Sequence, residues 1–135
     1  MAGMSIFDIA GRAMSAQLVR LNTTASNLAN AGQVATRAED AYRARKPIFA
    51  AVLDRASDAR ATVRVDDVVA ASAPPMRRYE PGHPLANKDG YVFEAAVDPN
   101  QELIEMVETA RQYQNDVEVL NTAKSLILGT LKLGQ

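Results

Sequence analysis

The residues that could support acid–base or metal chemistry are few in this chain and lie far apart. His83 is the only histidine, it lies within Pro81-Gly82-His83-Pro84, and no cysteine is present. Catalysis needs an acid, a base or a nucleophile held against a partner group, whereas a histidine in such a turn is more typical of an exposed or turn-stabilising side chain. A metal site needs three or four convergent ligands, and Asp66 and Asp67 would point to opposite faces of a strand. We therefore expect no enzyme activity, no metal and no cofactor.

The charge distribution also argues against a nucleic-acid or phosphate ligand. The formal net charge is −1, and the short basic cluster at 43–46 is balanced by Glu39 and Asp40. Nucleic-acid binding depends on an excess of basic side chains that neutralise phosphates, and glycine-rich phosphate loops are absent. We expect neither nucleic acid nor a small-molecule substrate as a partner.

The first element expected is a helix over residues 5–31. Ser5 can cap its start with Asp8 three residues later, and Asn30-Ala31-Gly32 is a stop signal. Its other faces carry mainly small, uncharged residues, whereas an isolated surface helix normally carries more charge on its wet face. We therefore expect it to be covered on several sides. Large apolar residues recur at every seventh position, namely Phe7, Met14, Leu21 and Leu28.

A second, longer helix is expected over residues 98–133, with Asp98 as its N-cap and Pro99 at its first position. Its apolar residues alternate in steps of three and four, as in coiled coils, and only Lys124 breaks the pattern. From Val119 onward it has no acidic residue and is apolar nearly all round, so this end too is expected to be buried on more than one side. The stripe consists of Leu103, Met106, Ala110, Tyr113, Val117, Leu120, Lys124, Ile127 and Leu131.

The residues between the helices predict β structure and an extended arm. Val63 and Val65 alternate with charged residues, a strand period, and Asp54–Ala61 is predicted to be a turn. Pro74-Pro75 and Pro81–Pro84 favour extended backbone. Short apolar runs occur at Pro47–Leu53, Thr62–Val69 and Gly90–Val97.

The expected fold is mainly α, with antiparallel N- and C-terminal helices forming a coiled-coil-like hairpin and a small β-hairpin or extended insert between them. The division is 1–32 for the first helix, 33–97 for the insert and 98–135 for the second helix, the two helices forming one domain. A heptad stripe alone fits an ordinary intramolecular hairpin, but the additional apolar and low-charge faces favour assembly with other subunits. The expected assembly interface comprises Phe7, Met14, Leu21, Leu28, Leu103, Met106, Tyr113, Val117, Leu120, Ile127 and Leu131.

Both ends of the chain resemble signatures of the flagellar axial proteins, the family of rod and hook subunits. The N-terminal match runs from Ile6 to Asn30 and centres on Ser26-Asn27-Leu28-Ala29-Asn30, and the C-terminal match covers Tyr113–Thr122 with Lys124-Ser125. Between them, Tyr79–Ala86 and Gly90-Tyr91-Val92 resemble a segment of the proximal-rod members. The resemblance spans nearly the whole chain.

The resemblance implies a structural subunit of the proximal rod of the flagellar basal body, needed for flagellum-dependent motility. Such subunits assemble into a helical tube that transmits motor torque and encloses the export channel. The implied partners are copies of the chain itself, other rod proteins of the FlgB, FlgF and FliE types, and the flagellar type III export apparatus. The implied location is the periplasmic rod. Export without a cleavable signal peptide is expected, because the N-terminus has no basic region and Asp8 interrupts its apolar stretch.

Two alternatives remain from the sequence: a rod protein of the FlgB type, and a cytoplasmic helical-hairpin adaptor or export chaperone. The insert is expected to determine where the subunit sits in the rod, with Tyr79, His83 and Tyr91 as position-specific contacts. The tyrosines could instead only hold the intervening turn against its own strands.

Overall fold

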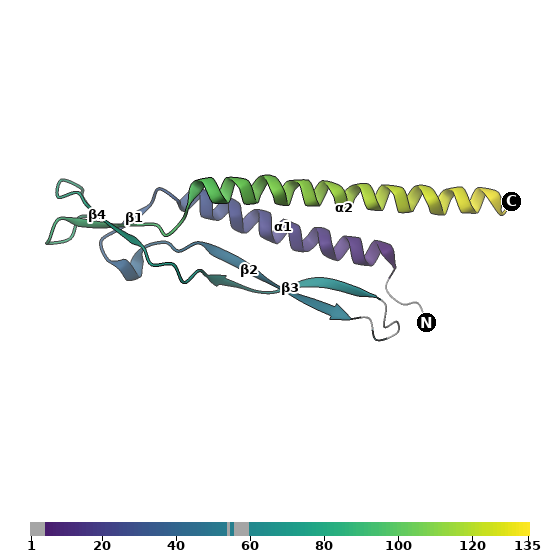
Figure 1. The fold of residues 1–135 in the computed structure, drawn as a ribbon, viewed down its shortest axis with the longest axis horizontal. Helices are drawn as coiled ribbons and strands as arrows, with labels where there is room; N and C mark the ends of the chain where they lie inside the picture. Colours follow the sequence, from purple (N-terminus) through teal and green to yellow (C-terminus); the bar gives the residue numbers. More distant parts are fainter. Residues whose placement is uncertain (1–4, 54, 56–59) are drawn as a thin grey trace.

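Two long helices lie side by side in the computed structural model, which describes residues 5–53, 55 and 60–135. Helix α1 spans Ile6–Asn30 and helix α2 spans Pro99–Leu133. Residues Gln17, Arg20 and Asn27 of α1 bond, in reverse chain order, to positions 112, 105 and 102 of α2, so the pair is antiparallel (Figure 1). The expected hairpin of terminal helices with a small β-rich insert between them is confirmed.

The helix starts follow the capping signals in the sequence. The Asp8 backbone N–H donates to the Ser5 hydroxyl at 3.2 Å, and the Ser5 backbone N–H donates to the Asp8 carboxylate at 2.9 Å. Asp98 accepts hydrogen bonds from the backbone N–H groups of residues 100 and 101. Helix α1 does not end at a glycine in the left-handed conformation. Gly32, the glycine of the expected stop signal, has no positive φ, because Gly90 is the only described residue that has one. The Ala31 N–H instead bonds to the Leu28 carbonyl at 3.3 Å in right-handed geometry.

The insert contains the expected antiparallel β-hairpin, formed by β2 (Arg45–Leu53) and β3 (Ala61–Ala70). Its register shifts once: Ile48 lies opposite Asp67, whereas Phe49 lies opposite Val65. Asp66 is therefore the extra residue of a β-bulge, which bends and twists the ribbon. The turn expected at Asp54–Ala61 lies mostly outside the described residues.

A second, three-stranded sheet was not expected from the sequence. Strand β1 (Val34–Ala35) and strand β4 (Met76–Tyr79) both pair with β5 (Tyr91–Glu94), giving the order β1-β5-β4, and a short 3-10 helix, η1 (Ala38–Asp40), follows β1. The expectation of extended backbone at 81–84 is wrong, because the His83 N–H bonds to the Glu80 carbonyl at 3.1 Å in a tight turn. Prolines at these positions set the turn dihedrals instead of extending the chain.

The β2–β3 ribbon folds back along α1, so that α1 lies between this ribbon and α2 (Figure 1). The expectation that the first helix is covered on several sides is thus confirmed within one chain. The core is thin, however, because the buried apolar residues in the described part of the chain are alanines, apart from one valine: Ala10, Ala16, Ala41, Ala44, Val92, Ala95 and Ala123. Small side chains bring the elements close together but each buries little area.

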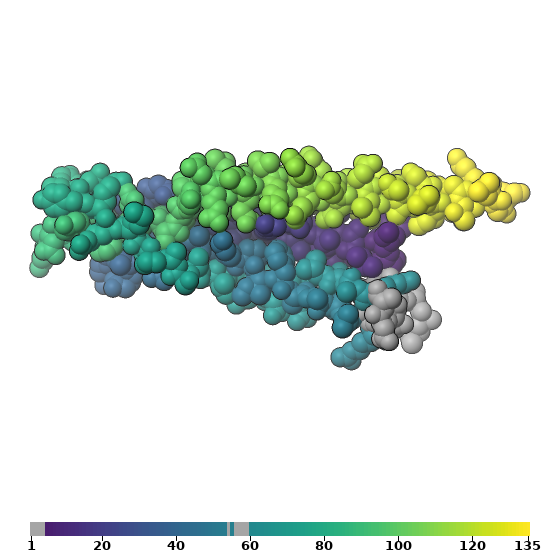
Figure 2. Space-filling model, viewed as in Figure 1, coloured from purple at the N-terminus to yellow at the C-terminus, as the bar shows by residue number. Residues whose placement is uncertain are grey.

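The molecule is long and narrow, and the C-terminal part of α2 projects beyond the described start of α1 (Figure 2). With 35 residues in α2 and 25 in α1, the helices are about 52 and 37 Å long at 1.5 Å per residue. Among the described residues, no helix is both long enough and apolar enough to cross a membrane.

Candidate assembly interface

The contact between α1 and α2 is built from polar and small side chains. Arg20 donates two hydrogen bonds to one carboxylate oxygen of Glu105, at 3.1 and 2.8 Å, and the Gln17 amide donates to Gln112 at 2.9 Å. Thr109, which is completely buried, donates from its hydroxyl to the backbone carbonyl four residues earlier. Polar side chains therefore bridge the two helices at several points along the pair.

Asn27 is 1% exposed, and its side-chain amide makes four hydrogen bonds. Its amide nitrogen donates to the Arg45 carbonyl at 2.9 Å and to Glu102 at 3.1 Å, and its amide oxygen accepts from the Arg45 N–H and the Tyr42 hydroxyl, both at 2.8 Å. The two Arg45 backbone bonds determine which way the amide points. We call Asn27, Tyr42, Arg45 and Glu102 the Asn27 cluster. It joins α1, α2 and the start of β2 at one point.

Sequence reasoning did not identify the Asn27 cluster, although Asn27 lies within the quoted signature. A polar residue in a helix ordinarily faces solvent. Burial becomes favourable here only because all of the hydrogen-bonding capacity of the amide is used.

None of the eleven predicted interface residues is fully buried within this chain. Phe7, Leu103, Ile127 and Leu131 are exposed, the last of them by 62%. Met14, Leu21 and Leu28 of α1 and Met106, Tyr113, Val117 and Leu120 of α2 are half-buried. The fully buried positions of the two helices are instead held by small or polar residues: Ala10, Ala16, Thr24 and Asn27 in α1, and Glu102, Thr109 and Ala123 in α2. All eleven stripe residues therefore keep part of their surface accessible.

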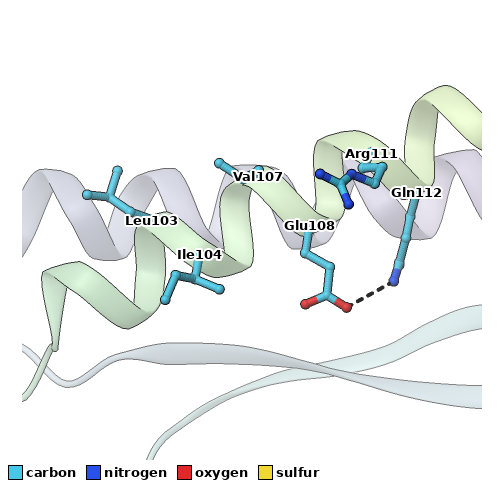
Figure 3. Close-up of a pocket in the computed structure, with 6 residues that line it drawn as sticks. All are labelled: Leu103, Ile104, Val107, Glu108, Arg111 and Gln112. Atoms are coloured by element: carbon cyan, nitrogen blue, oxygen red, sulfur yellow. Dashed lines mark hydrogen bonds between the residues drawn. The ribbon is translucent and has the colours of Figure 1, made fainter.

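Further apolar surface lies on the face of α2 turned away from α1. Ile104 is 68% exposed and Val107 is 61% exposed, and with Leu103 they line a shallow recess that also includes Glu108, Arg111 and Gln112 (Figure 3). In this view α1 lies behind α2. Ile104 and Val107 were not among the expected interface residues, because they fall outside the single heptad stripe.

Of the three insert residues expected to make position-specific contacts, the two tyrosines meet across β4 and β5, whereas His83 lies in the turn between these strands. Tyr79 and Tyr91 lie opposite each other in register and their rings meet edge to face at 5.1 Å. The Arg77 guanidinium lies 4.4 Å from the centre of the Tyr91 ring, a cation–π distance. Nδ1 of His83 accepts a hydrogen bond from the Leu85 N–H at 3.0 Å. The tyrosines thus hold the turn to its own strands, but Tyr79 also remains 62% exposed.

Charged groups outside the helix contact show local effects on pKa. Hydrogen bonds from the backbone and hydroxyl of Ser5 hold the pKa of Asp8 below its ordinary value, and the Arg37 guanidinium lowers the pKa of Asp40. Partial burial raises the pKa of Asp116. Within the described ranges, no group of three or more His, Cys, Asp or Glu side chains could hold a metal ion.

Comparison with known families defines the class of protein first. Residues 7–32, which contain most of α1, match the family described as "Flagella basal body rod protein". Residues 88–133, which contain β5 and α2, match the family described as "Flagellar basal body rod FlgEFG protein C-terminal". The paired helices of this fold are therefore the two segments that characterise flagellar rod proteins.

Full-length relatives narrow the class to one family. The chain is 47% identical over 137 residues to the flagellar basal-body rod protein FlgC of Escherichia coli O6:H1, 46% identical over 136 residues to that of Salmonella typhimurium, and 44% identical over 135 residues to that of Yersinia enterocolitica. Each comparison covers 100% of both chains. The chain belongs to the FlgC family of flagellar basal-body rod proteins, and it is a structural subunit and not an enzyme. Both alternatives from the sequence, a FlgB-type protein and a cytoplasmic adaptor, are set aside.

Proposed function

We propose that this chain forms part of the proximal rod in the periplasm, where its paired helices line a tube that transmits torque and encloses the export channel. The observation that carries this proposal is the apolar surface left bare on α2. Nine of its large apolar side chains are exposed: Leu103, Ile104, Val107, Val119, Leu126, Ile127, Leu128, Leu131 and Leu133. Large apolar side chains exposed to this extent mark a protein–protein interface.

The proposed interface includes the stripe residues of both helices together with the outer face of α2. Because the chain buries mainly alanines in its own core, burial between subunits would supply much of the stability that the isolated chain lacks. The proposed neighbours are copies of this chain and rod proteins of the FlgB, FlgF and FliE types. We also propose that the flagellar type III apparatus exports the chain unfolded, without cleavage of a signal peptide. A small, weakly self-contained core suits that route.

We propose further that the insert determines the position of the subunit in the rod, through the exposed side of Tyr79 and through the turn that carries His83. The helices share the general axial-protein pattern, and specificity requires surfaces that differ among competing subunits. A chimera that carries residues 32–97 of this chain between the helices of another rod protein tests this part. If the chimera occupies the place of the helix donor, the helices determine the position and the proposal is wrong.

Deletion and complementation test the main proposal. A strain that lacks this chain is expected to be non-motile and to assemble no rod beyond the missing subunit. The wild-type chain should restore motility and be recovered in purified basal bodies. A deletion strain that still swims, or a restored strain whose basal bodies lack the chain, would contradict the proposal.

A further inference from the structure

The end of α2 extends past the described part of α1. Ile6 at the start of α1 lines the same recess as Val119, Ala123 and Leu126 of α2, and beyond this turn no other described helix or strand runs beside α2 (Figure 1). We call residues 124–133 the C-terminal overhang. Within it, Leu126 is 67% exposed, Leu131 62% and Leu133 91%.

One face of the C-terminal overhang combines leucines with the two lysines. Lys124, Leu128, Leu131 and Lys132 are spaced at i, i+4, i+7 and i+8, which places them on one side of a helix. All four are exposed, and the segment from Val119 to Gln135 has no acidic side chain. This surface is therefore apolar and positively charged.

The other end of the same helix has the complementary character. We call Leu103, Ile104, Val107 and Glu108 the acidic-end patch, and Figure 3 shows these side chains on one face of α2 with α1 behind it. Residues 98–118 carry six acidic side chains against Arg111 as the single basic one. Glu105 is paired with Arg20 and Glu102 is bonded to Asn27. Glu108 is exposed, accepts a long 3.4 Å bond from Gln112 and lines the recess together with Arg111.

We propose that the C-terminal overhang of one subunit packs on the acidic-end patch of a second copy of this chain. Leucines meet the apolar residues of the patch, and Lys124 or Lys132 lies near Glu108 of the neighbour. Because two different surfaces meet, the contact is heterologous, and such contacts propagate as rings or open helical assemblies instead of closing as dimers. The inference rests on the proposed function, since it names the surfaces through which copies of the chain meet in the rod.

A double-cysteine variant tests this contact directly, because the chain has no cysteine of its own. Val107→Cys and Leu131→Cys lie 24 residues apart on one helix, about 36 Å, so they cannot form a disulfide within one subunit. The variant is expressed in a strain that lacks the chain, the cells are oxidised, and isolated basal bodies are run on a non-reducing gel. The expected result is a ladder of dimers, trimers and larger species, while either single variant stays monomeric. Ile104→Cys with Leu128→Cys should repeat the result one turn away.

Charge reversal supplies the matched control. Glu108→Lys in the double-cysteine background should reduce the amount of cross-linked protein about threefold, as expected for loss of an exposed ion pair. Adding Lys132→Glu should restore that amount. Val107→Cys with Ser72→Cys, which is exposed in the link between β3 and β4, should give no ladder. Three outcomes would overturn the inference: disulfide-linked dimers from either single variant, cross-links only to a different rod protein, or no ladder in cells that swim under reducing conditions. Swimming by those cells would leave the proposed function intact.

Discussion

Replacing Asn27 tests whether one buried amide holds the three main elements together. Asn27→Ala removes all four hydrogen bonds of the cluster, each worth about 1 kcal/mol net. Tyr42 is half-buried and can regain a water partner, whereas Glu102 is only 5% exposed. We therefore expect a loss of about 3 kcal/mol in the free energy of unfolding. Such a loss is a large fraction of the total stability of a typical domain, which is about 5–15 kcal/mol.

Urea denaturation followed by far-UV circular dichroism measures this loss, and Asn22→Ala is the matched control. Asn22 is an exposed asparagine on the same helix, so its replacement should change stability by less than about 0.5 kcal/mol. If the two variants unfold at the same urea concentration, the amide of Asn27 does not stabilise the junction and the reasoning is wrong.

The near-isosteric change Asn27→Asp separates hydrogen bonding from packing. It replaces the donating NH₂ group with an oxygen that faces the Arg45 carbonyl and the Glu102 carboxylate, so it should destabilise more than alanine does. Glu102→Gln restores a donor toward position 27 and removes the repulsion between the two carboxylates. The double variant is therefore expected to be more stable than Asn27→Asp alone. If the two substitutions are simply additive, the Asn27–Glu102 contact contributes nothing.

Three further predictions concern other parts of the molecule. Gly90 has a φ of 83°, and a Cβ there would lie 2.9 Å from a ring carbon of Tyr79 in β4. Gly90→Ala should therefore lower the thermal midpoint by an amount equivalent to about 1–3 kcal/mol. Gly82 has open space around it, so the control Gly82→Ala should leave the thermal midpoint unchanged. Lys124→Leu should impair swimming less than Leu120→Asp, because Lys124 is exposed and Leu120 is half-buried; the reverse order in a soft-agar assay would show that the stripe is misassigned. Burial raises the pKa of Asp116, so its proton is held more tightly in the folded state and stability is lost as pH rises through the folded pKa. Asp116→Asn should therefore raise the thermal midpoint at neutral pH. If this gain in thermal midpoint does not shrink on acidification, burial of the Asp116 carboxylate is not its cause.

The sequence by itself determined the two helices and the β2–β3 ribbon, because the signals for them are local. The Ser5–Asp8 capping box, the Asp98 N-cap with Pro99, and the alternation around Val63 each act within a few residues, and the observed helices and ribbon begin where these signals are. The two terminal signatures likewise identified the flagellar family from residues adjacent in the chain.

Tertiary structure alone decided which faces of these elements meet. The heptad stripe predicted a row of apolar residues, but the fully buried helix positions are held by alanine, threonine, Asn27 and Glu102. Asn27 became a buried junction only because Arg45 and Glu102, which are 18 and 75 residues away in the chain, supply its partners. The three-stranded sheet depends in the same way on β5 pairing with distant β1. Such pairings involve residues far apart in sequence, and no local pattern records them.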